Sequence, residues 1–438
     1  MKNKQTGQQL YKKAKKLIPG GTMLLSKRPE MFLPELWPSY YNKAKGKFIW
    51  DLDNTKYLDM SIMGIGTSVL GYSNKEVDNA VIKNIRKGNM ATLNCPEEVE
   101  LAERLVELNP WADMVRFAKT GGEANMIAIR IARASAAKSK VAVCGYHGWH
   151  DWYLSMNLKK SDNLKHHLLP NLDIKGVPEE LEGTVFPFFY NDFNSLLDVV
   201  NNQDIGVIKM EVERSYPPKD NFLERVRKLC DQKSIVLIFD ECTSGFRETD
   251  SGLYKKFNVI PDIVIYGKAL GNGFPITAIV GKKSVMEAAQ ETFISSTFWT
   301  ERSGVTAALK TLEIMNKNKT WEYITGIGQM MKSSWEKYAK INNVEIELLG
   351  IPAIANFIFK DINHNKYKTY MTKMFYDNKI LASNLFYPST AHSKSDFTKY
   401  DQVLDKTFYM ISKFQNGSEN INDHIKTPFA HNTFRRLN

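Results

Sequence analysis

The chain has 438 residues, of which 43% are hydrophobic and 24% charged, and its formal net charge is +11. These values are typical of a soluble globular protein with one large and one smaller domain. The positive charge comes mostly from scattered lysines rather than from a stripe interleaved with aromatic residues, so we expect a solvated surface and no nucleic-acid partner.

The N-terminus and the cysteines indicate a cytoplasmic protein. The N-terminal stretch lacks the apolar core of a signal peptide, and no apolar run approaches the ~20 residues of a membrane span. The four cysteines form no Cys-x-x-Cys pair, which argues against a zinc ribbon or a thioredoxin motif. We therefore expect a reduced, cytoplasmic chain with no membrane partner.

The sequence pattern of the N-terminal part predicts two helices and a hairpin. A polar helix over Gln8–Leu17 is expected to stop at Pro19-Gly20-Gly21. In Gly46–Met60 apolar residues alternate around a turn at Asp53-Asn54, which is typical of a β-hairpin. The second helix is expected over Glu76–Lys87.

From about residue 96, strands alternate with helices. The strands are continuous apolar runs, as in a parallel sheet buried on both faces. We therefore predict an α/β fold with a mostly parallel central sheet flanked by helices. Its strands are expected over Met114–Ala118, Val141–Cys144, Ile205–Met210, Ile235–Phe239 and Ile263–Tyr266, and its helices over Pro96–Leu108, Gly122–Ala136 and Phe222–Gln232.

The last third is lysine-rich and less regular. Helices over Thr320–Ala339 and Lys366–Asn378 flank a strand over Ala353–Lys360, which indicates a smaller α+β domain. The predicted division is residues 1–60, which join the small domain, residues 61–315, the large domain, and residues 316–438, the small domain.

Polar residues follow the predicted strands at five places. In parallel α/β sheets ligands bind beyond the carboxyl ends of the strands, so these residues are expected to meet at one edge. The five places are Thr120-Gly121-Gly122, Tyr146-His147, Glu211, Asp240 and Lys268.

Two of these clusters have competing interpretations. Thr120-Gly121-Gly122 is either an anion cradle at a helix N-terminus or a plain tight turn. The aromatic stretch from Tyr146 to Trp152 has three interpretations. Its rings stack on a flat ligand, or it is a loop packed on the core, or His147, His150 and Asp151 bind a metal. The metal interpretation lacks a supporting signature such as His-Glu-x-x-His.

Asp240 and Lys268 lie at the ends of predicted buried strands, where the presence of a charged side chain has to be explained. A carboxylate at a buried strand tip requires a partner, which a protonated ring nitrogen or a salt bridge would supply. A desolvated lysine has a lowered pKa and attacks carbonyl carbons, whereas a solvated one simply caps the strand. Glu211 is either a structural carboxylate or a member of the site at the same edge of the sheet.

Together the clusters match the parts of a pyridoxal phosphate (PLP) site. The cofactor has a phosphate, a flat ring, a pyridine nitrogen and an aldehyde, and four of the five clusters offer one group for each. Asp240 would keep the pyridine protonated. Lys268 would hold the aldehyde and then serve as the base that moves the α-proton.

The motifs resemble those of the class III, fold type I PLP-dependent aminotransferases, nearest the glutamate-1-semialdehyde aminomutase branch. From about Ile18 to His392, six motifs match in order: IPGG, GKFIWDLDNTKYLD, MVRFAKTGGEAN, YHGWHD, IFDECTSGFR and YGKALGNGFP.

The resemblance implies a role for each matched residue. Lys268 resembles the Schiff-base lysine and Asp240 the partner of the ring nitrogen. Gly121 and Gly122 resemble the phosphate loop, and Tyr146, beside His147, the stacking aromatic residue. Glu211 matches the glutamate of a Glu-Pro motif, and Thr297 a threonine that contacts the phosphate from the neighbouring subunit. A homodimer with shared active sites is therefore implied.

The chain departs from the family pattern at several positions, most of which line the substrate side in the family. Gly122 stands where a hydroxyl residue is usual, so Thr120 or Thr297 would have to make that contact, and Val212 replaces the Glu-Pro proline. Three further segments differ: Ser61–Gly66, Asn384–Ser389 and Thr300-Glu301-Arg302. The cofactor half is thus retained and the substrate half changed.

The expected function is transfer of an amino group from a donor such as L-glutamate to an aldehyde or ketone, with a sugar-like anionic metabolite as one guess for the acceptor. An intramolecular aminomutase is the alternative. A non-catalytic protein on this fold and a zinc hydrolase are less favoured. The sequence leaves open which arginine would anchor a substrate carboxylate; Arg28, Arg247 and Arg302 are the options.

Overall fold

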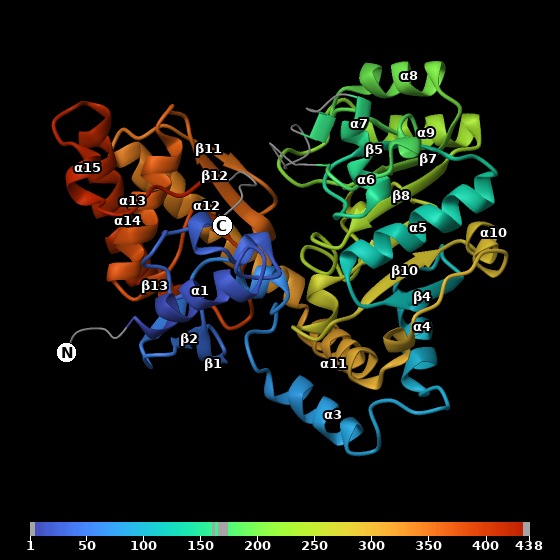
Figure 1. The fold of residues 1–438 in the computed structure, drawn as a ribbon, viewed down its shortest axis with the longest axis horizontal. Coiled ribbons are helices and arrows are strands. Elements are labelled where there is room, and N and C mark those ends of the chain that lie inside the picture. Colours follow the sequence, from blue (N-terminus) through green and yellow to red (C-terminus); the bar gives the residue numbers. More distant parts are fainter. Residues whose placement is uncertain (1–4, 160–162, 165–173, 432–438) are drawn as a thin grey trace. The chain divides into compact units, whose positions relative to one another are not determined.

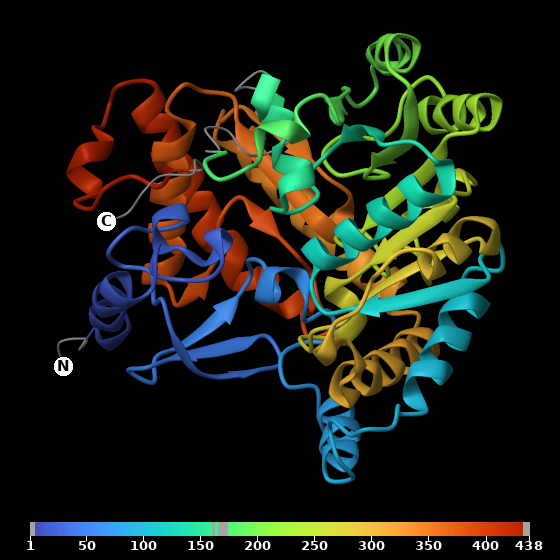
Figure 2. The ribbon, with the colours of Figure 1, turned by 45° about the vertical axis from the view of Figure 1, so that its right-hand side comes forward.

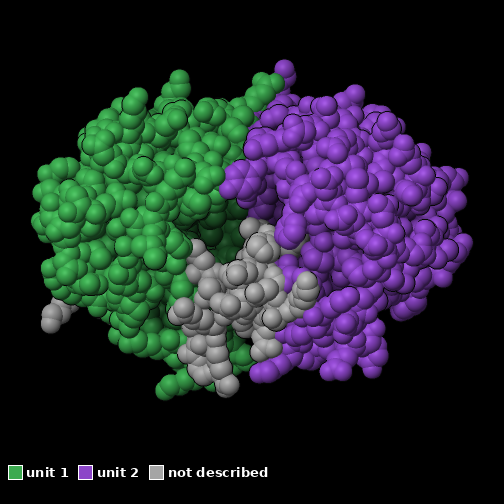
Figure 3. Space-filling model, turned by 90° about the horizontal axis from the view of Figure 1, so that it is seen from above, with its two compact units in different colours: residues 1–74, 322–438 green, residues 75–321 purple. Residues whose placement is uncertain are grey.

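The structure is a computed structural model that describes residues 5–159, 163–164 and 174–431. The chain forms two compact units (Figure 3), one made of residues 1–74 with 322–438 and one of residues 75–321. The sequence places the corresponding boundaries after residues 60 and 315. No helix in the described residues is long and apolar enough to cross a membrane.

The unit of residues 75–321 is built on a seven-stranded sheet (Figure 1). All its strands run parallel except β10, which is antiparallel to both of its neighbours. The predicted mostly parallel α/β sheet is therefore confirmed. In spatial order the strands are β4 (Met114–Ala118), β10 (Thr277–Gly281), β9 (Ile263–Tyr266), β8 (Val236–Glu241), β7 (Ile205–Met210), β5 (Lys140–Cys144) and β6 (Val185–Pro187).

Helices flank this sheet. Helix α5 (Gly121–Ala136) runs across the strands from β10 to β7 (Figure 2), and its buried Ile127 and Ile131 pack in the same core as Ile238 and Ile265. The other helices of this unit are α3 (Lys75–Ile85), α4 (Glu97–Leu108), α6 (Asp151–Leu154), α7 (Met156–Lys159), α8 (Phe193–Asn202), α9 (Phe222–Lys233), α10 (Lys283–Met286) and α11 (Arg302–Asn318).

The other unit joins both ends of the chain in one sheet. Strands β2 (Phe48–Asp51) and β3 (Lys56–Asp59) form the predicted hairpin, and the Asp51 carboxylate closes its turn by accepting from the Thr55 N–H at 2.8 Å. Strand β3 then pairs in parallel with β13 (Ile380–Leu381). The N-terminal hairpin is thus part of the sheet that contains the C-terminal segment.

The rest of this unit is α+β. Strand β1 (Tyr41–Lys45) extends the hairpin, and β11 (Ile346–Leu349), β12 (Ala355–Phe359) and β14 (Leu385–Phe386) form a second sheet. Its core gathers Trp335, Phe357, Phe375, Tyr400 and Phe408. The helices are α1 (Thr6–Leu17), α2 (Met63–Gly66), α12 (Thr320–Ile341), α13 (His364–Asp377), α14 (Lys394–Gln415) and α15 (Ile421–His424).

Candidate active site

The five predicted polar clusters lie at one edge of the seven-stranded sheet. Strands β4, β5, β7, β8 and β9 are parallel, so their carboxyl ends share that edge. The residues that follow them are Thr120 after β4, Tyr146 and His147 after β5, Glu211 after β7, Asp240 within the end of β8, and Lys268 after β9. The expectation that they share one edge is confirmed.

Asp240 is buried, and both of its carboxylate oxygens have polar neighbours. His147 Nδ1 lies 2.8 Å from its Oδ2, and the Cys242 N–H donates to its Oδ1 at 3.1 Å. Lys209 Nζ lies 3.7 Å from Oδ2. Burial alone would raise the pKa of Asp240, but the charge of Lys209 and the hydrogen bond with His147 outweigh it and hold that pKa well below its usual range. Asp240 is therefore a carboxylate at neutral pH.

Lys268 begins the short 3₁₀ helix Lys268–Gly271, directly beyond β9. Its backbone φ is +38°, in the left-handed region that side chains other than glycine rarely adopt, which indicates strain at this position. Its Nζ donates a 2.7 Å hydrogen bond to Thr243 Oγ1. Desolvation, assisted by the positive charge of Arg214, lowers the pKa of Lys268 to about 8. The amine is thus poised as a nucleophile near neutral pH.

The N-terminus of α5 offers backbone donors. Thr120 and Glu123 form a reciprocal capping box, in which Thr120 Oγ1 accepts from the Glu123 N–H. Within the described residues, the N–H groups of Gly121 and Gly122 have no hydrogen-bond partner. Two unpaired donors at the positive end of a 16-residue helix suit an anion such as a phosphate.

The absence of a side chain at Gly122 has a steric reason. A Cβ there would lie 2.8 Å from His150 Cε1 and 3.0 Å from His150 Nδ1. The His150 ring, stacked on Trp149 at 4.5 Å between centroids, thus lies where the side chain of a hydroxyl residue would be. With Thr120 committed to the capping box, the cradle is built mainly from backbone donors.

Tyr146 and Glu211 lie side by side at this edge. The Tyr146 N–H donates to Glu211 Oε2 at 3.4 Å, and the Tyr146 side chain is 37% exposed, so a flat ligand can reach its ring. Glu211 Oε1 accepts from Arg214 Nη1 at 2.9 Å. Arg214 therefore belongs to the site, although the sequence analysis does not identify it.

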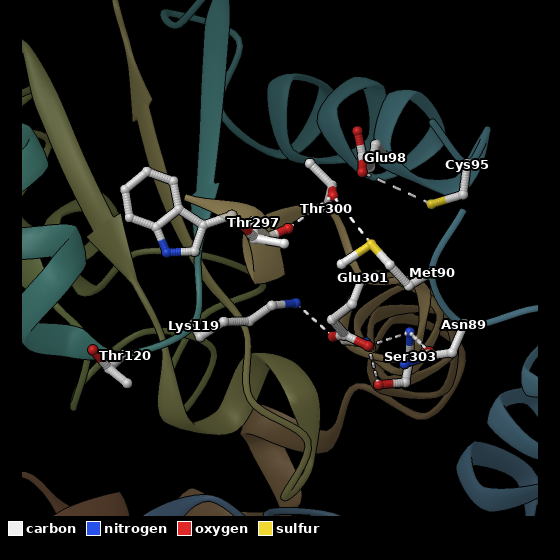
Figure 4. Close-up of polar contacts among 12 residues, drawn as sticks. Asn89, Met90, Cys95, Glu98, Lys119, Thr120, Thr297, Thr300, Glu301 and Ser303 are labelled. Carbon is white, nitrogen blue, oxygen red and sulfur yellow. Dashed lines mark hydrogen bonds and ion pairs between the residues drawn. The ribbon is translucent and has the colours of Figure 1, made fainter. Parts of the chain in front are cut away.

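Thr297 lies in an exposed 3₁₀ turn, Thr297–Thr300, which contacts the start of α5 and is followed by a residue that contacts the end of β4. Trp299 Nε1 donates to Glu123 Oε1 at 3.1 Å. Lys119 Nζ lies 2.5 Å from Glu301 Oε1 (Figure 4). Glu301 also caps α11 by accepting from the N–H groups of Ser303 and Gly304. The acidic residue that departs from the family pattern is thus a helix cap and half of a buried ion pair.

Glu301→Ala is expected to lower the free energy of unfolding by about 2–4 kcal/mol, because it removes the cap of α11 and strands the charge of Lys119. Both side chains are only 10–12% exposed. The midpoint of urea unfolding of the full chain measures the loss. Glu313→Ala breaks an exposed pair with Lys310 in the same helix and is the matched control, expected to stay within ~0.5 kcal/mol. Equal midpoints for the two variants would contradict the assignment.

The three arginines proposed as carboxylate anchors differ in setting. Arg302 is held by both oxygens of Glu97, at 2.7 and 3.0 Å. Arg247 is fully buried and donates from Nε to the Thr243 carbonyl at 2.6 Å. Arg28 belongs to the other compact unit. The structure thus gives Arg302 and Arg247 internal partners.

The metal interpretation gains no support. Both ring nitrogens of His147 are engaged, Nδ1 with Asp240 and Nε2 with the Cys144 carbonyl at 3.0 Å. Within the part of the chain that the structure describes, no group of three or more His, Cys, Asp or Glu side chains converges. His147 instead supports Asp240.

Comparison with known proteins identifies the family. Residues 35–374 match the aminotransferase class-III family, so the chain belongs to it. It is 33% identical to the 3-aminobutyryl-CoA aminotransferase of Cloacimonas acidaminovorans over 92% of this chain and 94% of that protein. It is 30% identical to the glutamate-1-semialdehyde 2,1-aminomutase of Methanococcoides burtonii over 88% of this chain and 95% of that protein.

Solved structures agree on the fold. The PLP-containing FumI protein of Sphingopyxis sp. MTA144 superimposes with a TM-score of 0.84 at 24% identity, over 94% of this chain and 97% of that one. The fold is therefore that of the fold type I PLP enzymes. Together with the family match, this makes the chain a PLP-dependent enzyme of the class III aminotransferase family. The strand-edge residues fit that cofactor: unpaired N–H groups for its phosphate, an ionised buried carboxylate and a poised lysine amine.

Proposed function

We propose that the enzyme moves an amino group from a donor such as L-glutamate to an aldehyde or ketone acceptor, with Lys268 and Asp240 as its catalytic residues. The observation that carries the proposal is the shared strand edge. A lysine amine with a lowered pKa follows β9, and an ionised, buried aspartate lies at the end of the neighbouring strand β8.

Each residue at the edge has a proposed part. Lys268 would hold the carbon of the cofactor's aldehyde and, once displaced by the substrate, take and return the α-proton. Asp240, supported by His147, would accept a hydrogen bond from the ring nitrogen. Gly121, Gly122 and Thr120 would hold the phosphate, and Tyr146 would stack on the ring beside Glu211. When bound, PLP supplies an electron-withdrawing ring that eases loss of the α-proton.

The donor and acceptor follow from weaker observations. Arg214 places a cation at the same edge, which favours a substrate with a carboxylate or another anionic group. A sugar-like anionic carbonyl compound remains our proposed acceptor class. Intramolecular aminomutation is the second candidate, and the similarity to glutamate-1-semialdehyde 2,1-aminomutases favours it. The aminotransferase relative, at 33% identity, favours transfer between two substrates.

The donor half-reaction tests the proposal. The PLP-loaded protein would be mixed with L-glutamate and no acceptor, and both the visible absorption and the 2-oxoglutarate released would be followed. Transamination predicts loss of the visible band with one 2-oxoglutarate per site. A panel of amino acids and amines then identifies the donor. If no amine in the panel bleaches the band while glutamate-1-semialdehyde turns over, the aminomutase candidate replaces transamination.

The lowered pKa of Lys268 predicts how fast the cofactor-free chain captures PLP. The neutral amine is the reactive form, and a pKa of about 8 leaves roughly a tenth of it neutral at pH 7, against roughly 0.03% for an ordinary lysine. The capture rate, followed by absorbance, is expected to rise about tenfold per pH unit below pH 8 and to level off above it. A rise that continues unchanged to pH 10 would contradict the lowered pKa.

We propose a cytoplasmic homodimer in which Thr297 reaches the phosphate of the neighbouring site. The supporting observation is a set of strongly exposed apolar residues in the unit of residues 75–321: Leu93 at 83%, Phe293 at 84% and Phe298, next to Thr297, at 68%. Light scattering of the native chain and of Phe298→Asp tests the association. A monomeric native chain with full activity would refute it.

A further inference from the structure

Lys209 lies where a lysine is costly. It belongs to β7, a central strand whose six residues are all buried, and its own side chain has no exposed surface. An ammonium there loses its hydration, so it must be neutral or be compensated by a nearby negative charge. None of the cofactor contacts proposed above involves this residue.

The nearest negative charge is that of Asp240. Lys209 Nζ lies 3.7 Å from Asp240 Oδ2, beyond hydrogen-bonding distance, and within the described residues it has no hydrogen-bond partner. Burial lowers the pKa of Lys209, and the charge of Asp240 opposes this, with smaller contributions from Cys242 and Glu211. Lys209 thus acts on Asp240 through its charge rather than through a hydrogen bond.

His147 contacts the same carboxylate oxygen. Its Nε2 faces the Cys144 carbonyl, which only accepts, so Nε2 carries a proton. Its Nδ1 lies 2.8 Å from Asp240 Oδ2, and that contact also requires a proton. The second proton is either on His147, which leaves Asp240 ionised, or on Asp240, which makes it a neutral carboxyl. A cation beside Oδ2 favours the first arrangement.

We propose that Lys209 is a positioning residue whose ammonium keeps this proton on His147 and so keeps Asp240 a carboxylate. Lys209 acts through Asp240 and touches neither cofactor nor substrate. The consequence for catalysis rests on the proposed role of Asp240 toward the ring nitrogen. The effect on the proton between His147 and Asp240 does not rest on it.

The test is ¹⁵N NMR of the full chain labelled at histidine and free of cofactor, with His147 assigned by its loss in His147→Asn. In the native chain both His147 nitrogens are expected to carry a proton, because each faces an oxygen that accepts. In Lys209→Met, which keeps an unbranched apolar stem without the charge, Nδ1 is expected to lose its proton. Ile208→Val, a mild change in the same strand, is the control and should keep the native signal.

The second readout is the release of PLP from the loaded enzyme. We expect release about tenfold faster in Lys209→Met and unchanged in Ile208→Val. If Lys209→Met does not fold, Lys209→Gln gives the same test with a polar neutral side chain. An unaltered His147 signal in the variant would overturn the inference. If the His147 signal changes in Lys209→Met but Asp240→Asn retains its cofactor fully, the inference about Lys209 holds and the proposed role of Asp240 toward the cofactor is refuted.

Discussion

Replacing Lys268 with alanine is expected to reduce kcat by roughly 10⁴- to 10⁶-fold, because the same amine is proposed to hold the cofactor and to move the α-proton. Its partly buried Nζ has the Thr243 hydroxyl as a neighbour at 2.7 Å, and a hydroxyl cannot replace an amine in either role. The measurement is steady-state transamination together with the visible absorption before and after borohydride. The native chain should lose its band and retain the cofactor covalently, whereas the variant should not.

Two controls separate chemistry from charge. Lys268→Arg keeps the positive charge, but arginine stays protonated, so it is expected to be as inactive as the alanine variant. Lys283→Ala, at an exposed lysine of the same unit, is expected to have native activity. An active Lys268→Arg would show that position 268 acts only through its charge, and the assignment of Lys268 would fail.

Asp240→Asn is expected to lower kcat by about 10²- to 10⁴-fold while the chain still folds. The ring nitrogen would lose its charged hydrogen-bond partner, and an activation barrier raised by about 3–5 kcal/mol corresponds to this loss, since each ~1.4 kcal/mol is a factor of ten in rate. Asparagine keeps the shape but not the charge, so His147 and Lys209 would face a neutral amide. Half-reaction rates with a saturating donor measure the loss.

The control for this variant is Asp231→Asn, which removes an exposed carboxylate from a pair with Arg227. It is expected to change kcat by less than twofold, since surface pairs contribute little. Asp240→Glu keeps the charge and is expected to recover part of the rate. If Asp240→Asn and Asp231→Asn were equally active, the carboxylate would have no part in catalysis.

The large unit could be predicted from sequence because its signals are local. Each buried parallel strand is a continuous apolar run, and strand β4 was expected at the residues where it is observed, Met114–Ala118. Strand β10 was not predicted, because Thr277–Gly281 is a short run directly after a turn and its pairing with β4 and β9 depends on distant residues. Helix α14 was not predicted either, although Phe397, Tyr400, Leu404 and Phe408 recur at helical spacing between its lysines.

The site could be predicted as far as it follows strand ends. Asp240 and Lys268 each come directly at the end of an apolar run, and the topology of a parallel sheet brings such residues together. The contacts of Thr243, Arg214 and Lys209 arise only from folding. Lys209 did leave a signal, a lone charge inside the buried run IGVIKM, and such a residue is worth testing for a charged neighbour.

The sheet that unites β3 with β13 affects how the chain folds on the ribosome. The hairpin strand β3 is made early, but its parallel partner at Ile380–Leu381 is made only after the whole unit of residues 75–321. At ~5–20 residues per second, the open edge of β3 would wait ~15–60 s for its partner. The continuous unit can meanwhile fold first, so nascent chains halted before residue 380 should contain a protease-resistant large unit and a protease-sensitive N-terminus.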